Sequence, residues 1–188
     1  MKSIQITNTR FEGLYILTPR IFPDERGGFI KIFHQESFAH LGLESTFQEC
    51  FFSYSHKGVL RGMHFQIPPH DCTKLVYVSS GKIEDVVLDI RKDSASFGEA
   101  FHITLDSACA QCLYIPSGFA HGFLSLEEGS IVHYLQTKLY APQSDSGILY
   151  DSFGFDWQKV ASQAGIQELI ISKRDREFER FSKDFSLM

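Results

Sequence analysis

Long hydrophobic runs and an excess of basic residues are both missing from this 188-residue chain. No stretch approaches the ~20 apolar residues that a membrane-spanning helix needs, and residues 1–5 lack the apolar core of a signal peptide. Eighteen Lys and Arg stand against 23 Asp and Glu, a formal net charge of -5, whereas nucleic-acid-binding proteins normally carry a basic excess. We therefore expect a cytoplasmic protein with neither membrane nor nucleic acid as partner.

Glycine-rich phosphate loops, dinucleotide fingerprints and GxSxG elbows are also absent, so any bound phosphate must be held by side chains. Cysteine is scarce, with Cys50, Cys72, Cys109 and Cys112. The last two form an isolated CxxC, which lacks both a second pair to complete a zinc site and the strand-to-helix setting of a redox motif. We expect no metal or redox role for them.

Aromatic residues and short alternating segments are abundant instead. Eighteen Phe and seven Tyr favour strands, and turn signals recur from about residue 10 to residue 140. Strands are predicted at residues 14–21, 29–33, 47–55, 59–66, 74–78, 82–90, 100–105, 112–115, 122–126 and 130–137. Their number and hairpin spacing indicate an all-β sandwich or barrel, with a jelly roll as the first choice.

The pattern changes after Asp151. Residues 157–171 and 175–181 have helical spacing and more charge, which predicts a C-terminal helical appendage, residues 152–188, packed on the β core. Another short helix is predicted at residues 36–43. Because no linker rich in Pro, Gly or Ser divides the chain, we expect one domain over residues 1–188.

The strand predicted at residues 59–66 carries both Arg61 and His64. A buried strand rarely carries a cation and an imidazole unless each has a partner, because both cost desolvation energy. Strict alternation places the two side chains on opposite faces. If both serve one site, a bulge or strand end near Gly62 must re-aim one of them.

His64 has the properties of a general base, and a carboxylate is the usual group that fixes its tautomer. The candidates, between which the sequence does not choose, are Asp85, Asp89 and Asp175. Lys74 begins a strand of apolar residues, where a fixed ammonium can stabilise an oxyanion. Tyr134 lies in the middle of a strand and can act as an opposing acid. Taken alone, His64 and Tyr134 are more often structural residues, and Lys74 is more often a solvated lysine at a strand edge.

Residues 116–121 have the form PxGxxH of the second cupin motif. Metal cupins combine it with an HxH pair, but the corresponding segment here reads His64-Phe65-Gln66. A three-ligand metal site is therefore not expected, and His121 is better interpreted as a hydrogen-bond donor or structural residue. The cations available for a phosphate group are Arg26, Arg61, Lys74 and Arg174.

Taken in order, these residues resemble the nucleotide-sugar 3,5-epimerases typified by dTDP-4-dehydrorhamnose 3,5-epimerase. The matching blocks run collinearly from the turn at residues 24–27 through residues 59–66, 74–76, 85–91, 115–123, 134, 140–142 and 172–175. The resemblance implies a cupin-type jelly-roll β-sandwich with short C-terminal helices. It also implies catalysis without metal or redox cofactor, in a homodimer that exchanges N-terminal strands.

The resemblance further implies the role of each residue. His64 is the base, Asp175 orients it, Lys74 stabilises an enolate and Tyr134 is the acid on the other face. The implied substrate-binding residues are Arg26 from the partner subunit, Phe29, Glu49, Phe51, Arg61, His121, Tyr140, Asp145 and Arg174. The implied reaction inverts C3, C5 or both in a nucleotide-diphospho-4-keto-6-deoxy sugar, in deoxysugar biosynthesis for surface polysaccharide. The alternatives are a 3,4-ketoisomerase on the same fold and a non-catalytic cupin-like module that binds sugar nucleotides.

The chain departs from the family pattern in part of the ligand shell. Glu49 and Phe51 stand where the family commonly has Gln-x-Asn, and Tyr114 and Ser117 replace the usual Trp and Glu. Because the proton-transfer set is intact, we expect retained chemistry on an altered substrate, such as a 4-keto heptose or a GDP or CDP carrier. The sequence leaves open the nucleotide, the size of the sugar and the carbon that is inverted.

Overall fold

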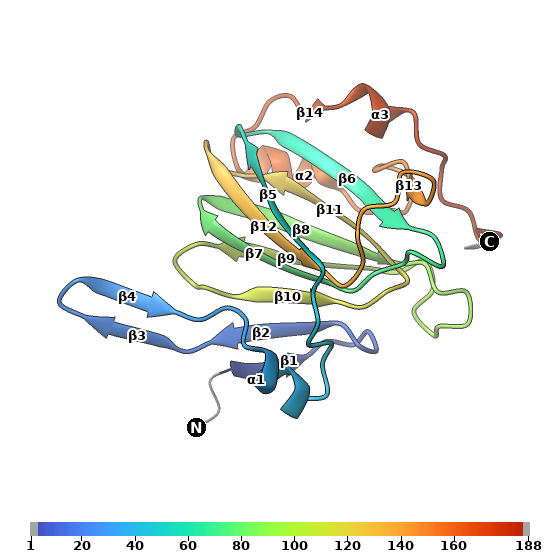
Figure 1. Cartoon of the computed structure of the whole chain (residues 1–188). Coiled ribbons are helices and arrows are strands. Elements are labelled where there is room, and N and C mark those ends of the chain that lie inside the picture. Colours follow the sequence, from blue (N-terminus) through green and yellow to red (C-terminus); the bar gives the residue numbers. More distant parts are fainter. Residues whose placement is uncertain (1–3, 186–188) are drawn as a thin grey trace.

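Two antiparallel sheets face each other in the computed structural model, which describes residues 4–185 (Figure 1). The first sheet has the strand order β1 (Ile4–Asn8), β2 (Tyr15–Pro19), β10 (Cys112–Ile115), β7 (Lys74–Ser80), β12 (Ser130–Gln136) and β5 (Glu49–Ser55). The second has the order β13 (Asp145–Gly147), β6 (Val59–Gln66), β11 (Phe119–Ser125), β8 (Lys82–Asp89) and β9 (Ala100–Asp106), and β14 (Ile170–Ile171) pairs in parallel with β6. The predicted all-β sandwich is confirmed.

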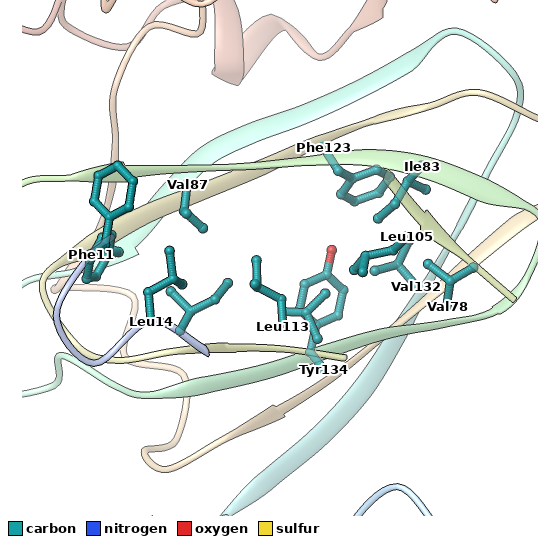
Figure 2. Close-up of a cluster of buried hydrophobic side chains, with 13 residues drawn as sticks. Phe11, Leu14, Val78, Ile83, Val87, Leu105, Leu113, Phe123, Val132 and Tyr134 are labelled. Atoms are coloured by element: carbon teal, nitrogen blue, oxygen red, sulfur yellow. The ribbon is translucent and has the colours of Figure 1, made fainter. Parts of the chain in front are cut away.

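The main core fills the space between the two sheets. Alternate residues of each strand point inward, so that Val87 and Phe123 of the second sheet face Leu113 and Val132 of the first. Figure 2 shows Tyr134 rising from the first sheet among these side chains, with its hydroxyl directed toward the sheet that carries Phe123. The Tyr134 hydroxyl of the first sheet thus points toward the inner face of the second sheet (Figure 2).

The C-terminal segment covers the outer face of the second sheet. Trp157 and Ala161 of α2 (Trp157–Gln163) pack there together with Leu169, and the indole Nε1 of Trp157 donates to the carbonyl of Tyr150 (2.8 Å). Both C-terminal helices are shorter than the spacing predicts. Helix α2 ends before Gly165, where φ is +68°, and α3 spans only Lys173–Arg176. No helix within residues 4–185 is long and apolar enough to cross a membrane.

A β-bulge interrupts strand β6 near Gly62, where the sequence predicts a bulge or a strand end if Arg61 and His64 serve one site. His64 pairs with His121 of β11, but Arg61 pairs with Phe123, so that three steps along β6 match two along β11. Gly62 adopts a φ of +124°, and a Cβ at this position would lie 2.5 Å from the Cα of Gly122. The bulge brings Arg61 and His64 to the same side of the strand, as the sequence requires if both serve one site.

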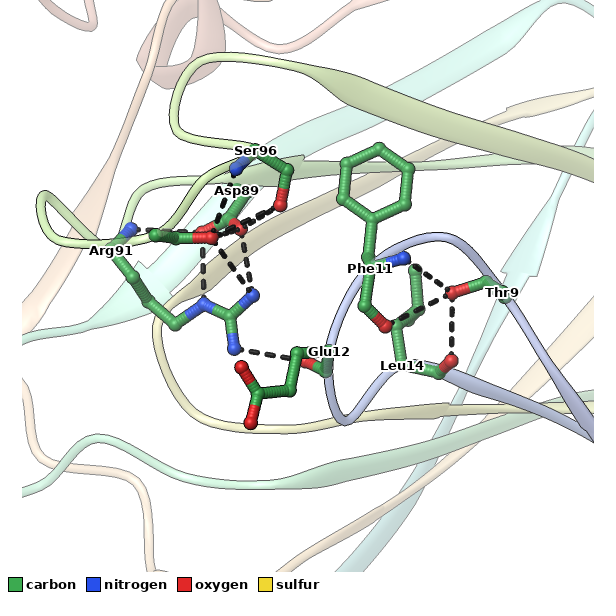
Figure 3. A network of polar contacts seen from close by, with 8 residues as sticks. Thr9, Phe11, Glu12, Leu14, Asp89, Arg91 and Ser96 are labelled. Atoms are coloured by element: carbon green, nitrogen blue, oxygen red, sulfur yellow. Dashed lines mark hydrogen bonds and ion pairs between the residues drawn. The ribbon is translucent and has the colours of Figure 1, made fainter.

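A buried ion pair fixes the far end of β8 (Figure 3). The carboxylate of Asp89 accepts hydrogen bonds from the Nε (2.9 Å) and Nη2 (2.7 Å) of Arg91, and from the hydroxyls of Ser94 and Ser96. Arg91 Nη1 in turn donates to the carbonyl of Glu12, in the turn between β1 and β2. The network ties the two sheets together at the end of the sandwich.

The N-terminal region adds a hairpin and a helix. Strands β3 (Ile21–Asp24) and β4 (Gly27–Ile30) form a two-stranded sheet of their own, which projects from the body of the molecule (Figure 1). Helix α1 (Gln35–His40) follows and buries Phe38 against the first sheet. A two-stranded hairpin has little independent stability, and this one exposes the side chain of Phe29.

Candidate active site

A cleft of about 380 Å³ lies between the two sheets, within the size range of small-molecule sites. Both sheets, the segment after β12 and α3 contribute to its walls. Ten of the residues predicted from the sequence line it: Glu49, Phe51, Arg61, His64, Lys74, His121, Tyr134, Tyr140, Asp145 and Arg174.

His64 and Asp175 form a hydrogen-bonded pair at this cleft. The Nε2 of His64 lies 2.9 Å from Oδ1 of Asp175, while Oδ2 of Asp175 accepts from the backbone amide of Gly62 (3.1 Å). Ser172 caps α3 by accepting from the Asp175 amide, which holds the carboxylate in place. Burial alone raises the pKa of Asp175, but the bonds from His64 and Gly62 outweigh it and the pKa is lowered. Asp175 is therefore an anion that orients the imidazole.

The other two candidate carboxylates have different partners. Asp85 Oδ2 lies 2.8 Å from Nε2 of His121, and both side chains are buried. Asp89 pairs with Arg91. Of the three carboxylates that the sequence left open, the structure brings only Asp175 into hydrogen-bonding contact with His64.

Lys74 places a buried amine in the cleft. Its Nζ donates to the backbone carbonyl of His64 (3.1 Å), which fixes the end of the side chain against β6. Burial lowers the pKa of Lys74 because the charged form loses its hydration, an effect opposed by nearby acidic groups that include Asp145 and Asp85. A desolvated ammonium of this kind is suited to meet negative charge that develops on a ligand.

Tyr134 faces the cleft from the opposite sheet. Burial raises the pKa of its phenol, and the negative charge of Asp85 raises it further, so the group is protonated at neutral pH. The ring stacks on Phe51, with centroids 4.8 Å apart and planes 14° apart, and meets the edge of His121 at 5.9 Å. The cleft therefore has an imidazole on one wall and a phenol on the other.

Polar side chains surround the mouth of the cleft. Asp145 Oδ2 accepts from Nη2 of Arg174 (2.7 Å) and from the phenol of Tyr140 (3.1 Å), and Glu49 Oε2 accepts from the Tyr140 amide (2.8 Å). Arg61 donates through Nε and Nη2 to the end of β5. These contacts hold two guanidinium groups at a cleft that is otherwise rich in apolar surface.

Two glutamines and a serine of the cleft were missed by the sequence interpretation. Gln66 accepts from the amide of Ala141 (2.7 Å) and donates to the carbonyl of His70 (2.8 Å), so it shapes the segment that carries Tyr140. Gln136 and Ser53 also line the cleft. Each lies two residues from a predicted site residue on the same strand, and this period-two spacing was the available signal.

Arg26 and Phe29 lie on the β3–β4 hairpin, outside the cleft. Arg26 pairs with Asp24 of the same turn (2.6 Å), and Phe29 is 61% exposed. Within residues 4–185, no group of three or more His, Cys, Asp or Glu side chains is arranged to hold a metal ion.

The family model of dTDP-4-dehydrorhamnose 3,5-epimerase matches residues 8–183. This chain belongs to that family. It is 40% identical to the dTDP-4-dehydrorhamnose 3,5-epimerase of Methanothermobacter thermautotrophicus over 181 residues, which cover 95% of each chain. The epimerase is thus an isomerase of the nucleotide-deoxysugar class, as the sequence predicted.

Solved structures of relatives share the fold of this epimerase. The Bacillus anthracis enzyme, solved with TDP and PPi bound, has a TM-score of 0.88 at 33% identity and covers 95% of this chain and 99% of its own. The Legionella pneumophila enzyme, solved in complex with dTDP-4-keto-L-rhamnose, has a TM-score of 0.86 at 34% identity, with 94% and 92% covered. The predicted cupin-type jelly roll of the epimerase family is confirmed.

Proposed function

We propose that this epimerase inverts C3, C5 or both in a nucleotide-diphospho-4-keto-6-deoxy sugar by proton transfer across its cleft. The observation that carries the proposal is the placement of a base and an acid on facing walls. The His64–Asp175 pair belongs to the second sheet and α3, while Tyr134 belongs to the first sheet, and His64 and Tyr134 line the same cleft.

His64 removes the proton. A C–H bond next to the C4 ketone is acidic because its loss gives an enolate, and a nearby general base lowers the barrier further. With Nε2–H donating to Asp175, the lone pair of Nδ1 is the one that accepts the proton. The carboxylate of Asp175 then stabilises the imidazolium that forms.

Lys74 stabilises the enolate oxygen. Its amine is fixed by the His64 carbonyl and is largely removed from water, so little reorganisation is needed when negative charge develops on O4. Donors arranged in this way typically contribute about 3 kcal/mol to a barrier.

Tyr134 returns a proton to the opposite face of the carbon, and the configuration is inverted. Its raised pKa keeps the phenol protonated until the enolate is formed. Loss of the proton at C3 gives the C3–C4 enolate and loss at C5 gives the C4–C5 enolate, but both place their negative charge on O4, so a single set of residues serves both carbons.

The substrate is a nucleotide sugar whose diphosphate binds near Arg61 and Arg174. TDP and dTDP-4-keto-L-rhamnose in the solved relatives favour a dTDP carrier. Glu49 and Phe51 line the cleft in the positions where the sequence departs from its family, which supports a sugar that differs from dTDP-4-keto-6-deoxyglucose, either a hexose or a heptose.

The active form is a homodimer in the cytoplasm that supplies deoxysugars for surface polysaccharide, with each 188-residue chain forming one domain. The projecting hairpin supports exchange of N-terminal segments, because it exposes Phe22 and Phe29 without a core of its own. In such a dimer Arg26 and Phe29 reach the nucleotide in the partner's cleft.

Incubation in deuterated water with dTDP, GDP and CDP 4-keto-6-deoxy sugars tests the proposal. NMR is expected to show deuterium at C3, C5 or both. A ketone found at C3 would identify a 3,4-ketoisomerase instead, and binding without exchange for any of the sugars would identify a non-catalytic module. Sedimentation of the purified protein as a monomer would contradict the dimer.

A further inference from the structure

Phe51 and Tyr134 are direct cross-strand partners in the first sheet. They occupy opposite positions in the register of β5 and β12, where facing side chains interact most strongly. Their rings stack nearly parallel, with centroids 4.8 Å and planes 14° apart. Phe51 is 39% exposed at the cleft wall, whereas Tyr134 is only 8% exposed. One face of the acid is therefore covered by an aromatic ring that itself borders the substrate space.

The other side of Tyr134 is limited by a second aromatic contact. His121 meets the phenol ring edge-on, with centroids 5.9 Å and planes 72° apart. The imidazole cannot easily yield, because its Nε2 is hydrogen-bonded to the fully buried Asp85 (2.8 Å). Tyr134 is thus held between a fixed ring and Phe51, which lies on the edge strand of the sheet.

This arrangement controls the phenolic oxygen. The oxygen lies on the long axis of the ring, so rotation of the ring about that axis leaves it in place, whereas a swing about χ1 moves it sideways. Contact with the face of Phe51 opposes a swing toward β5. A shift of about 1 Å in a reacting group can change a rate by about 100-fold, so the contact has consequences for proton delivery.

We propose that Phe51 is a positioning residue that holds the Tyr134 hydroxyl and thereby sets how proton return is divided between C3 and C5. The proposal rests on the proposed epimerase function. The two carbons flank the C4 ketone, and both are reached by the same acid. Each enolate takes its proton back at the carbon that lost it, from Tyr134 with inversion or from the His64 side with retention. The position of the phenolic oxygen therefore determines how often the C3 enolate and the C5 enolate are each protonated with inversion. His64 removes the proton from the facing wall of the cleft.

The test compares Phe51→Leu with the wild-type protein in deuterated water, using the dTDP, GDP and CDP 4-keto-6-deoxy sugars and NMR of the sugar. Leucine keeps the apolar character but removes the flat face. We expect the ratio of inversion at C3 to inversion at C5 to shift by roughly tenfold, while both C–H protons still exchange. Phe51→Tyr keeps the stacking face and is expected to restore the wild-type ratio.

Phe52→Leu is the matched control. Phe52 follows directly on β5 but points to the outer face of the sheet, where it packs against His133 and is 62% exposed. It changes the same strand by the same substitution, so it is expected to leave the ratio unchanged. A wild-type ratio in Phe51→Leu, or an equal shift in Phe52→Leu, would overturn the positioning role. Absence of exchange in the wild-type protein with all of these sugars would instead overturn the proposed function itself.

Discussion

Replacement of Asp175 by Asn is expected to slow proton removal while the protein remains folded. The carboxylate accepts two hydrogen bonds, from Nε2 of His64 (2.9 Å) and from the amide of Gly62 (3.1 Å). Asparagine has one acceptor oxygen and one donor group, so it can satisfy only one of these partners. It also removes the negative charge that stabilises the imidazolium during proton transfer.

The size of the effect follows from these contacts. A hydrogen bond that involves a charged group contributes about 1.5–3 kcal/mol, and each 1.36 kcal/mol changes a rate by about tenfold. Loss of the charged contact to His64 therefore predicts a fall in kcat/KM of about 10- to 150-fold. The fall should appear in the exchange rate itself and not only in KM, because the interaction strengthens as the imidazolium forms.

The assay follows deuterium exchange of the nucleotide sugar by NMR at neutral pH, with thermal unfolding measured in parallel. Glu177→Gln is the matched control, since Glu177 lies just after α3, is exposed, and pairs with Lys173 rather than with a cleft residue. Its exchange rate should equal that of the wild type. A wild-type exchange rate in Asp175→Asn would refute the orienting role of this carboxylate.

Three further substitutions test other parts of the account. Lys74→Met is expected to lower the exchange rate by about 100-fold. Because burial lowers the pKa of Lys74, the unfolded chain binds the lysine proton more tightly than the folded chain does. The variant removes this cost, so denaturant titration at pH 7 should show a higher free energy of unfolding than for the wild type. Asp89→Asn breaks the buried pair with Arg91 and should cost about 3 kcal/mol of unfolding free energy. Burial raises the pKa of Asp89, but its hydrogen bonds outweigh this effect and the pKa is lowered. The contribution of Asp89 to the free energy of unfolding is therefore present above the pKa of the unfolded state and is lost as the pH falls through the pKa of the folded state. The free energy of unfolding of Asp89→Asn should lack this acid dependence. Gly62→Ala places a Cβ 2.5 Å from the Cα of Gly122 at a φ of +124° and should lower the free energy of unfolding by about 2 kcal/mol or more; an unchanged melting temperature would argue against the bulge.

The sequence predicts the strands that carry the site with some accuracy. Strand β6 has the predicted bounds, Val59–Gln66, as does β10, Cys112–Ile115, because local alternation and turn residues define both ends. The bulge was also predictable, since Arg61 and His64 can share a site only if one extra residue lies between them. Periodicity overestimates α2 and α3, because apolar residues after Gly165 follow a helical spacing while packing on the second sheet as loop and strand.

Local sequence patterns do not predict which residues far apart in the chain contact each other. Asp85, Asp89 and Asp175 were equivalent in sequence, but the sheet register brings Asp85 to His121, and α3 brings Asp175 to His64. The stack of Phe51 on Tyr134 likewise depends on the pairing of β5 with β12. These contacts join segments more than 30 residues apart, so only the topology determines them.

In the proposed mechanism, His64 removes a proton from one face of the sugar and Tyr134 returns one to the other. The most direct measurement compares His64→Ala and Tyr134→Phe in deuterated water, following exchange and product configuration separately by NMR. No exchange is expected in His64→Ala, whereas Tyr134→Phe should still exchange the C–H proton but form no inverted product. Inverted product at the wild-type rate in either variant would contradict the account.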